Sequence, residues 1–472
     1  MAIIHKASNP ELLLDLWLIN SVLVNEEKYQ KLPSSLPAEF GSGADFLIVE
    51  YDYIQYYMDS APPIKLLAFY FIRDERVYFT VTSSIASLCE DIDKLCPSSV
   101  AIQKFIHTNE LPLFLLGAPL MLKPIYIPKP WGQEIWYTGI EKRGVSLATD
   151  GNASTPLPWV LSVAPKRLVE NKERGVNLLK ILDPFSDPLY GDLYFELHEK
   201  KREVYVVTDV DENSWPDGSG GIRFGWNEEI KRSFSSEESF YAAYLQTVQD
   251  YQFSRRGIDK QLDVFRQKEG FTLDEVVPID TKKQWMKLLP DSIQIEEERL
   301  RIKMNNFTSV LPLKIGDAVK IPLLVPHGLL HGVRVVEFQT PVYERLILSF
   351  NQKTLTQNHW DTEEALSVMS TTSNPIADTT VVNKNSDCLT EEIALFKDFK
   401  VLRLTLSAFS SCILLQEKNY RLALVIKGGV CCNDQSLRKE CALLLPANLE
   451  NICVKNNHKS TSIMLLASPV DL

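Results

Sequence analysis

The stretch GDLYFELHEKKRE, residues 191–203, decides how this sequence is interpreted. Glu196 and His198 are two residues apart, and on a β-strand residues with this spacing point to the same face. The charged run Glu199–Arg202 is typical of a turn, and it would return the chain so that Glu203 lies on a neighbouring strand. We therefore expect a carboxylate, an imidazole and a second carboxylate to converge on one point.

A second short motif supplies another histidine. The stretch VPHGLLH, residues 325–331, contains Pro-x-Gly-x-x-His, a tight turn that would place His331 at the start of a strand. By itself, a Glu-x-His pair on a strand more often lies on a solvent-exposed face of a sheet. The Pro-x-Gly-x-x-His turn that follows this pair and Glu203 along the chain favours a metal site. Two histidines and two carboxylates suit a borderline divalent cation. The four expected ligands are Glu196, His198, Glu203 and His331. His327 is expected at the surface or behind the ligands.

Together the two motifs resemble the two-part signature of the cupin superfamily, His-x-His and Glu followed by Pro-x-Gly-x-x-His. Within the cupins, the chain is most similar to type I phosphomannose isomerases, whose ligands are Gln-x-His, Glu and His. Other short motifs resemble that family in the same order over about residues 123–366. These are Trp131-Gly132, the strand around Lys180, Gly225-Trp-Asn227, Glu337-Phe-Gln339 and Tyr343-Glu-Arg345-Leu.

The chain departs from this family pattern in three places. Glu196 stands where the family has a neutral glutamine, the hairpin before Glu203 is tighter, and the segment after Gln339 is shorter. Two ligand carboxylates would cancel the formal charge of a dication, which weakens its Lewis acidity. The other two departures leave the identity of the substrate open.

The resemblance implies a metal-dependent aldose–ketose isomerase that interconverts mannose 6-phosphate and fructose 6-phosphate. It also implies one divalent metal, with zinc first and manganese or iron as alternatives. The reaction needs a base, a group that stabilises an enediolate and an anchor for the phosphate. The candidates are Glu337 as the base, Lys180 as the oxyanion partner and Arg345 as the anchor, because a guanidinium group suits phosphate. Each residue also has a purely structural alternative. Glu337 could be an acid on the face of a sheet, Lys180 could cover the edge of a strand, and Arg345 could pair with a nearby acid.

Two other functions remain open. The chain could be a different cupin metalloenzyme that acts on another sugar or on a small acid, which the altered ligand and the shortened segment favour. It could also be a non-catalytic sugar-binding or regulatory protein. In that case the N-terminal section, which has no counterpart in the family, would be an interaction module.

The predicted fold is mainly β with a helical insertion, α+β overall, with two cupin-type barrels or sandwiches. We expect an N-terminal α+β domain over residues 1–120 and a metal-binding cupin domain over 121–370, with its helical insertion at about 235–305. A linker over 371–388 and a second, metal-free cupin-like domain over 389–472 would follow.

Several elements are predicted from local patterns. Asn9-Pro10-Glu11 predicts a helix start, with the helix running towards Leu32-Pro33, and Ser235 with Glu238 resembles a capping box. Residues 86–107 also have a helical pattern. Strands are expected at 46–54, 65–72, 76–83 and 159–164, among others.

The chain has 472 residues, with 50 Lys and Arg against 61 Asp and Glu, a net charge of −11. This acidic balance argues against a nucleic-acid partner and against adhesion to an anionic membrane. No apolar stretch approaches the roughly 18–20 residues that cross a bilayer, and the N-terminus lacks the pattern of a signal peptide. The eight cysteines form no Cys-x-x-Cys pair, as expected for reduced thiols in a cytoplasmic enzyme. The expected partner is a small sugar phosphate, and the oligomeric state stays open.

Overall fold

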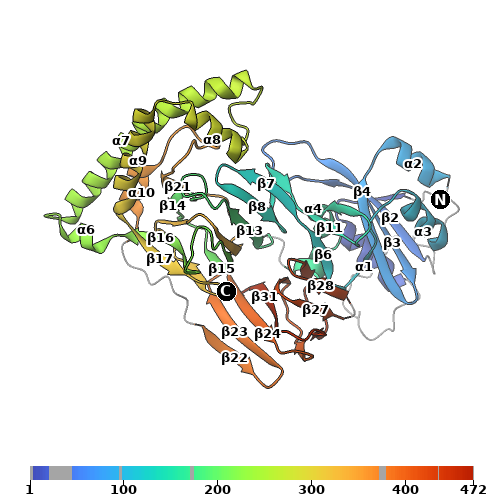
Figure 1. The fold of residues 1–472 in the computed structure, drawn as a ribbon. Coiled ribbons are helices and arrows are strands. Elements are labelled where there is room, and N and C mark those ends of the chain that lie inside the picture. The colour runs from blue at the N-terminus through green and yellow to red at the C-terminus, as the bar shows by residue number, and fades with distance from the viewer. Residues whose placement is uncertain are drawn as a thin grey trace. The chain divides into compact units, whose positions relative to one another are not determined.

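A computed structural model describes residues 4–20, 45–94, 98–170, 175–370, 379–433 and 435–470. These residues are mainly β and form two compact units (Figure 1). Unit 1 contains residues 1–125, 137–177 and 380–472, and unit 2 contains residues 126–136 and 178–379. Among the described residues, no helix is long and apolar enough to cross a membrane.

Unit 2 is built on two open sheets with a shared core. The first has the order β18 (Ala318–Ile321), β15 (Glu203–Val210), β20 (Val333–Gln339), β13 (Leu178–Pro184), β8 (Gly132–Trp136) and β7 (Ile125–Lys129). The second has the order β17 (Thr308–Leu313), β16 (Gly220–Trp226), β19 (His327–Leu329), β14 (Phe195–Leu197) and β21 (Leu346–Ser349). Val207 and Val335 of the first sheet belong to the same buried cluster as Leu329 of the second. Neither sheet closes into a barrel within the described ranges.

A helical insertion separates β16 from β17. It consists of α6 (Glu228–Arg232), α7 (Glu237–Lys268), α8 (Ile279–Lys287) and α9 (Asp291–Asn306). The predicted capping box is wrong by one position, because Ser236 caps the helix: its Oγ accepts from Ser239 N at 3.2 Å, and Ser239 Oγ accepts from Ser236 N at 3.1 Å. The buried face of α7 packs in one cluster with β21 and with α10 (Thr362–Val368).

Unit 1 contains a nine-stranded sheet and a four-stranded sheet that share a second core. The nine strands are ordered β12 (Ser154–Pro156), β11 (Leu147–Thr149), β6 (Leu120–Lys123), β29 (Ala442–Leu445), β26 (Arg421–Lys427), β31 (Ser462–Pro469), β24 (Phe399–Leu406), β23 (Cys388–Leu395) and β22 (Thr380–Lys384). The four are ordered β25 (Ser411–Leu414), β30 (Ile452–Lys455), β27 (Gly429–Cys432) and β28 (Gln435–Arg438).

The N-terminal section and residues 389–472, which were expected to form separate domains, both lie in unit 1. The sheet explains this difference, because Leu120 and Leu122 of β6 pair with Leu444 and Ala442 of β29. Of the expected linker, residues 371–378 lie outside the described residues, and 380–384 form the strand β22.

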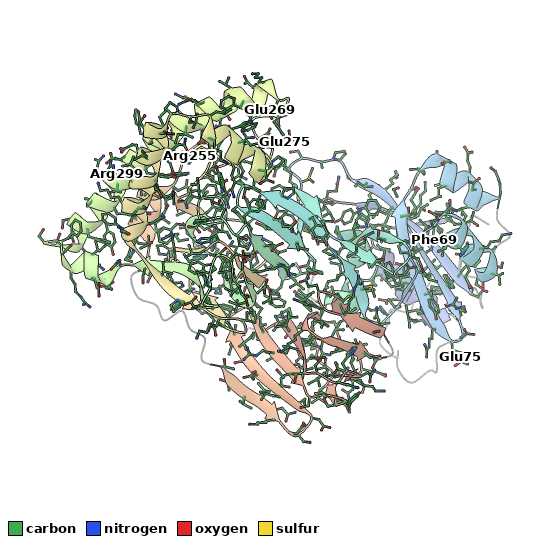
Figure 2. All side chains as sticks on the ribbon, viewed as in Figure 1. Phe69, Glu75, Arg255, Glu269, Glu275 and Arg299 are labelled. Atoms are coloured by element: carbon green, nitrogen blue, oxygen red, sulfur yellow. The ribbon has the colours of Figure 1, made fainter. Side chains whose placement is uncertain are left out.

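A third sheet in unit 1 comes from the N-terminal section. Its order is β1 (Ile4–Lys6), β2 (Phe46–Tyr53), β3 (Ile64–Arg73), β4 (Arg76–Ser83) and β5 (Phe114–Leu115). The predicted strands at 46–54, 65–72 and 76–83 are therefore confirmed. The labelled Phe69 in Figure 2 lies in β3, is fully buried, and stacks on Phe105 with ring centroids 5.7 Å apart.

Helices complete unit 1. The helix start at Asn9 is confirmed, since its Oδ1 accepts from Glu11 N at 3.1 Å in front of α1 (Pro10–Asn20). The predicted continuation towards Leu32 lies outside the described residues. Residues 86–107 form two helices, α2 (Ala86–Asp93) and α3 (Ser99–Thr108). A small hairpin pairs β9 (Ile140–Glu141) with β10 (Gly144–Val145).

The predicted strand at 159–164 is wrong. The segment forms α4 (Leu157–Val163), which is followed by α5 (Pro165–Val169). Pro158 lies in the first turn of α4, where a missing N–H costs nothing, and most of the helix is buried. A short, largely apolar run does not distinguish a buried strand from a buried helix, which explains the error.

Candidate metal and catalytic site

Three buried side chains from both sheets of unit 2 meet at one point. His198 follows β14, Glu203 begins β15 and His327 begins β19. One ligand atom of each lies within 4.8 Å of the others, and each residue is at most 1% exposed. The Nε2 atoms of His198 and His327 are 3.5 and 3.4 Å from the same oxygen, Glu203 Oε2. In the described part of the chain, this is the one group of three such side chains that could hold a metal ion.

Hydrogen bonds to the backbone set the orientation of both imidazoles. His198 Nδ1 lies 3.1 Å from Glu344 O, and His327 Nδ1 lies 3.0 Å from Val325 O. A carbonyl oxygen only accepts, so each Nδ1 carries the proton and each Nε2 presents a lone pair. Burial, assisted by the charge of Lys201, lowers the pKa of His198 and favours its neutral form.

The two Nε2 atoms have no hydrogen-bond partner among the described residues, although both are buried. Such an unpaired buried nitrogen is costly unless something binds it. Two neutral imidazoles and one carboxylate are the donor set of many divalent-metal sites. The residues present therefore fit a divalent cation.

Glu203 is held in its charged form. Burial alone would raise the pKa of this carboxylate, but the charge of the Lys201 ammonium holds it well below its usual range. Lys201 Nζ forms an ion pair with Glu203 Oε1, and Tyr205 Oη donates to Glu203 Oε2 at 2.9 Å. The sequence analysis assigned Lys201 only to a turn. Its signal was the spacing of two from Glu203, which places both side chains on one face of an extended chain.

Glu337 and Lys180 lie opposite each other on β20 and β13, as adjacent partners in the sheet register. Their charged atoms are 3.9 Å apart, and Lys180 Nζ also donates to Gln339 Oε1 at 3.1 Å and lies 3.7 Å from Glu134. Burial and the charge of Glu203 raise the pKa of Glu337 well above its usual range, against the opposing charge of Lys180. The pKa values of these two buried carboxyl groups are therefore shifted in opposite directions.

Glu196 lies at the edge of the group of three. Its Oε1 is 3.8 Å from His198 Nε2, whereas its Oε2 is 3.3 Å from Arg345 Nη1. Arg345 in turn lies over the Tyr194 ring, 4.3 Å from its centroid, and donates from Nη2 to Thr356 Oγ1 at 2.7 Å. The predicted phosphate anchor is thus paired with a predicted ligand.

His331 does not belong to the group of three, and this corrects the expected ligand set. Strand β19 ends at Leu329, and His331 lies in the turn that follows. Its Nδ1 is 2.7 Å from Asp192 Oδ1, and its ring stacks on Trp215. The histidine that the register places opposite Glu196 is His327. The strand was expected to begin after the turn, at His331, but it begins at His327.

Comparison with known proteins gives a likeness of fold. No protein-family model matches the sequence, and no curated protein matches it. The structure is similar to mannose 6-phosphate isomerase from Bacillus subtilis, with a TM-score of 0.50 and 13% identity, over 74% of this chain and 99% of that chain. A putative mannosephosphate isomerase from Archaeoglobus fulgidus gives a TM-score of 0.46 and 10% identity, over 75% of this chain and 98% of that chain. The Bacillus protein shares the fold of this chain, so the predicted likeness of fold to the phosphomannose isomerases is confirmed.

Proposed function

We propose that this chain is a metal-dependent aldose–ketose isomerase that acts on a sugar phosphate. Mannose 6-phosphate and fructose 6-phosphate are the first substrates to test. The observation that carries the proposal is the convergence of two buried imidazole Nε2 atoms on Glu203. The fold shared with a mannose 6-phosphate isomerase supports the choice of reaction.

His198, Glu203 and His327 would hold the metal, and Glu196 is the nearest further donor, 3.8 Å from His198. A bound divalent cation would polarise the oxygens of the substrate. Zinc suits the two imidazoles, and a second carboxylate would favour manganese or iron relative to zinc.

Other residues of the site would transfer the proton and bind the negatively charged groups of the substrate. Glu337 is our candidate for proton transfer, because its raised pKa lets a carboxyl group both take and return a proton nearer neutral pH. Lys180 and Lys201 bring positive charge to the site, where it would stabilise an enediolate. Arg345 would bind the phosphate by exchanging its partner Glu196 for a phosphate oxygen.

We further propose that the two-sheet cores of the two units are two cupin-type halves, with metal in unit 2 alone. Each half consists of a larger and a smaller sheet around one core. In the described residues of unit 1 there is no group of three His, Cys, Asp or Glu side chains like that in unit 2.

The test is metal content after exhaustive dialysis, measured by mass spectrometry on purified chain. We expect about one metal ion per chain in the wild type and in His331→Ala, and near-complete loss in His327→Ala. His331→Ala is the matched control, because it also removes a histidine from residues 325–331, but one that lies outside the group of three. Equal metal content in His327→Ala and the wild type would remove the support for this site. Isomerase activity on mannose 6-phosphate should follow the metal content.

A different cupin metalloenzyme is the second candidate. The ion pair between Arg345 and Glu196 favours it, because the residue meant to anchor phosphate already has an anionic partner. Turnover of unphosphorylated sugars or small hydroxy acids by the metal-loaded chain, without turnover of sugar phosphates, would select it. Metal retention without any turnover would instead select the non-catalytic sugar-binding alternative.

A further inference from the structure

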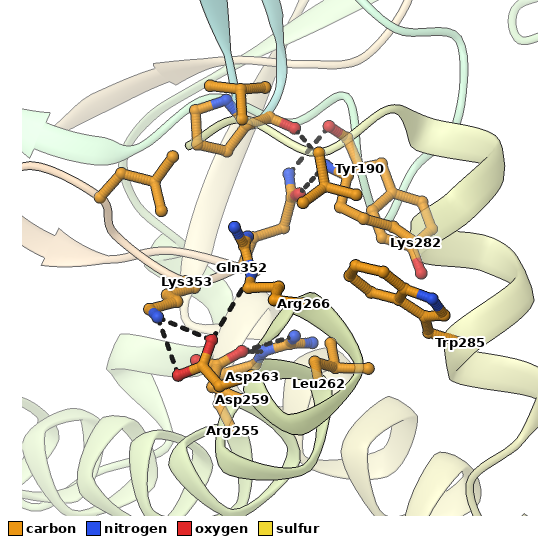
Figure 3. A pocket seen from close by; sticks show the side chains of 14 residues that line it. Tyr190, Arg255, Asp259, Leu262, Asp263, Arg266, Lys282, Trp285, Gln352 and Lys353 are labelled. Atoms are coloured by element: carbon orange, nitrogen blue, oxygen red, sulfur yellow. Dashed lines mark hydrogen bonds and ion pairs between the residues drawn. The ribbon is translucent and has the colours of Figure 1, made fainter. Parts of the chain in front are cut away.

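Unit 2 contains a second polar pocket, between α7, α8 and the segment that follows β21 (Figure 3). It comprises two adjoining cavities of about 30 and 190 Å³, which share Arg255, Asp259, Asp263, Gln352 and Lys353. Lys282 and Arg266 line the smaller cavity. None of the residues that line this pocket is one of the candidate metal ligands His198, Glu203 and His327.

Cations outnumber carboxylates around the smaller cavity. Asp259 Oδ1 accepts from Arg255 Nε and Nη2 at 2.9 and 2.7 Å. Asp263 accepts from Lys353 Nζ at 2.8 and 2.9 Å. Arg266 Nε also lies 3.5 Å from Asp263 Oδ1, so two cations share this acid. Four cations thus line the smaller cavity against two acids, and Lys282 is the cation that pairs with neither acid.

Lys282 is buried without a carboxylate partner among the described residues. It is 8% exposed, and its Nζ donates to Pro130 O at 2.8 Å and to Gln352 Oε1 at 2.7 Å. Both acceptors are neutral. Burial, with the added positive charges of Arg255 and Arg266, lowers the pKa of Lys282 to about 7.

Arg255 provides the second observation. The labelled side chain is 4% exposed, extends from α7 and lines both cavities (Figure 3). Its Nη1 atom is buried and has no hydrogen-bond partner among the described residues. An unpaired donor of a buried guanidinium is costly, and an oxyanion is the ligand that best satisfies it.

We infer that this pocket binds a phosphate group, with Arg255 Nη1 and Lys282 Nζ as its main donors. A cavity needs a volume of about 10–15 Å³ to hold one water. The smaller cavity, with about 30 Å³, therefore has room for two or three groups of the size of a water. The 190 Å³ cavity beside it accepts the organic part of a small phosphorylated molecule. The inference is independent of the proposed isomerase reaction.

The test is calorimetric titration of the full chain with inorganic phosphate and, separately, with glucose 6-phosphate. The titration uses an Arg345→Gln background, so that binding at the proposed catalytic site is not counted. We expect binding of phosphate that weakens at least tenfold on Lys282→Met and on Arg255→Lys. Arg299→Gln is the matched control, because Arg299 is exposed on α9 and pairs with Glu296 outside the pocket (Figure 2). Its affinity should equal that of the background.

Two outcomes overturn the inference: no binding of either probe, or affinities that Lys282→Met and Arg255→Lys leave unchanged. Tighter binding of glucose 6-phosphate assigns the larger cavity to the organic part, and equal affinities assign the pocket to inorganic phosphate. A crystal soaked in tungstate gives a readout that needs no variant. Anomalous density within hydrogen-bond distance of Arg255 Nη1 and Lys282 Nζ is expected, and its absence there overturns the inference as well.

Discussion

At the scale of single residues, Glu196 lies between the proposed metal ligands and the proposed phosphate anchor. It contacts Arg345 through one oxygen and approaches His198 through the other. Glu196→Gln keeps the volume of the side chain and removes one negative charge. We expect the metal content after dialysis to stay near the wild-type value, with a preference shifted towards zinc over manganese, measured by competition dialysis. Glu199→Gln, on the exposed turn, is the control. Loss of metal in Glu196→Gln would show that the carboxylate is an obligatory ligand.

Lys282 predicts a pH dependence of stability. Its pKa of about 7 in the folded chain is below the ordinary 10.5, so the unfolded chain holds more protons between these values. Stability therefore rises with pH across this window, by at most about 1.4 kcal/mol per pH unit from this group, and the full penalty is present below pH 7. We expect the difference in unfolding free energy between Lys282→Met and the wild type to shrink from pH 7 to pH 10. Urea titrations in phosphate-free buffer measure it, and a pH-independent difference contradicts the shift.

Much of the candidate metal site could be predicted from the sequence, because side chains along a strand alternate between its two faces. That alternation accounts for Glu196 and His198, whose Oε1 and Nε2 atoms lie 3.8 Å apart, whereas Glu203 approaches His198 from the next strand, after the charged turn. The alternation does not say where a strand begins, and a shift of the start by a few residues exchanged His327 for His331. The same spacing of two places Lys201 on the face of Glu203, but the ion pair between them depends on how the charged turn folds, which the sequence of the turn does not specify.

At the scale of elements, the first position of β8 requires a glycine, Gly132. It begins β8 with φ of +151°, and a Cβ there would lie 2.2 Å from Asp183 O on the paired strand β13. We expect Gly132→Ala to cost roughly 3 kcal/mol of stability, through strain and overpacking. Gly257→Ala is the control, since Gly257 lies in α7 with no atom near its added Cβ. Alanine there should stabilise by up to about 1 kcal/mol. Equal urea midpoints for Gly132→Ala and the wild type would contradict this.

Local patterns predicted elements well where the two periods differ clearly. The strands of the N-terminal sheet were recognisable by their aromatic and β-branched residues between short turns, and the long α7 by its helical spacing of apolar residues. The largely apolar α4 was not, because most side chains of such a run are buried in either conformation. Pairing between distant strands, such as β6 with β29, depends on tertiary contacts that no local pattern encodes.

At the scale of the whole molecule, the sheet pairing sets which fragments can fold alone. All four residues of β29 are buried, and β6 covers one edge of this strand. We expect an isolated fragment of residues 380–472 to lack cooperative unfolding, because that apolar edge is exposed. Adding a fragment of residues 1–177 should restore cooperative unfolding, measured by circular dichroism. A fragment of residues 99–170, which keeps α4 but ends before β13, tests whether β6 suffices. Cooperative unfolding of residues 380–472 alone would contradict the prediction.

The same pairing has a consequence during synthesis. About 320 residues separate the end of β6 from the start of β29, so at roughly 5–20 residues per second the ribosome needs roughly 15–60 s to deliver the partner. All of unit 2 emerges within that interval and can complete its sheets first. The nascent chain must meanwhile keep Leu120 and Leu122 of β6 away from other chains. Unit 1 is thus the last part to mature, and a stall in translation before Ala442 would leave unit 2 folded while unit 1 still lacks β29.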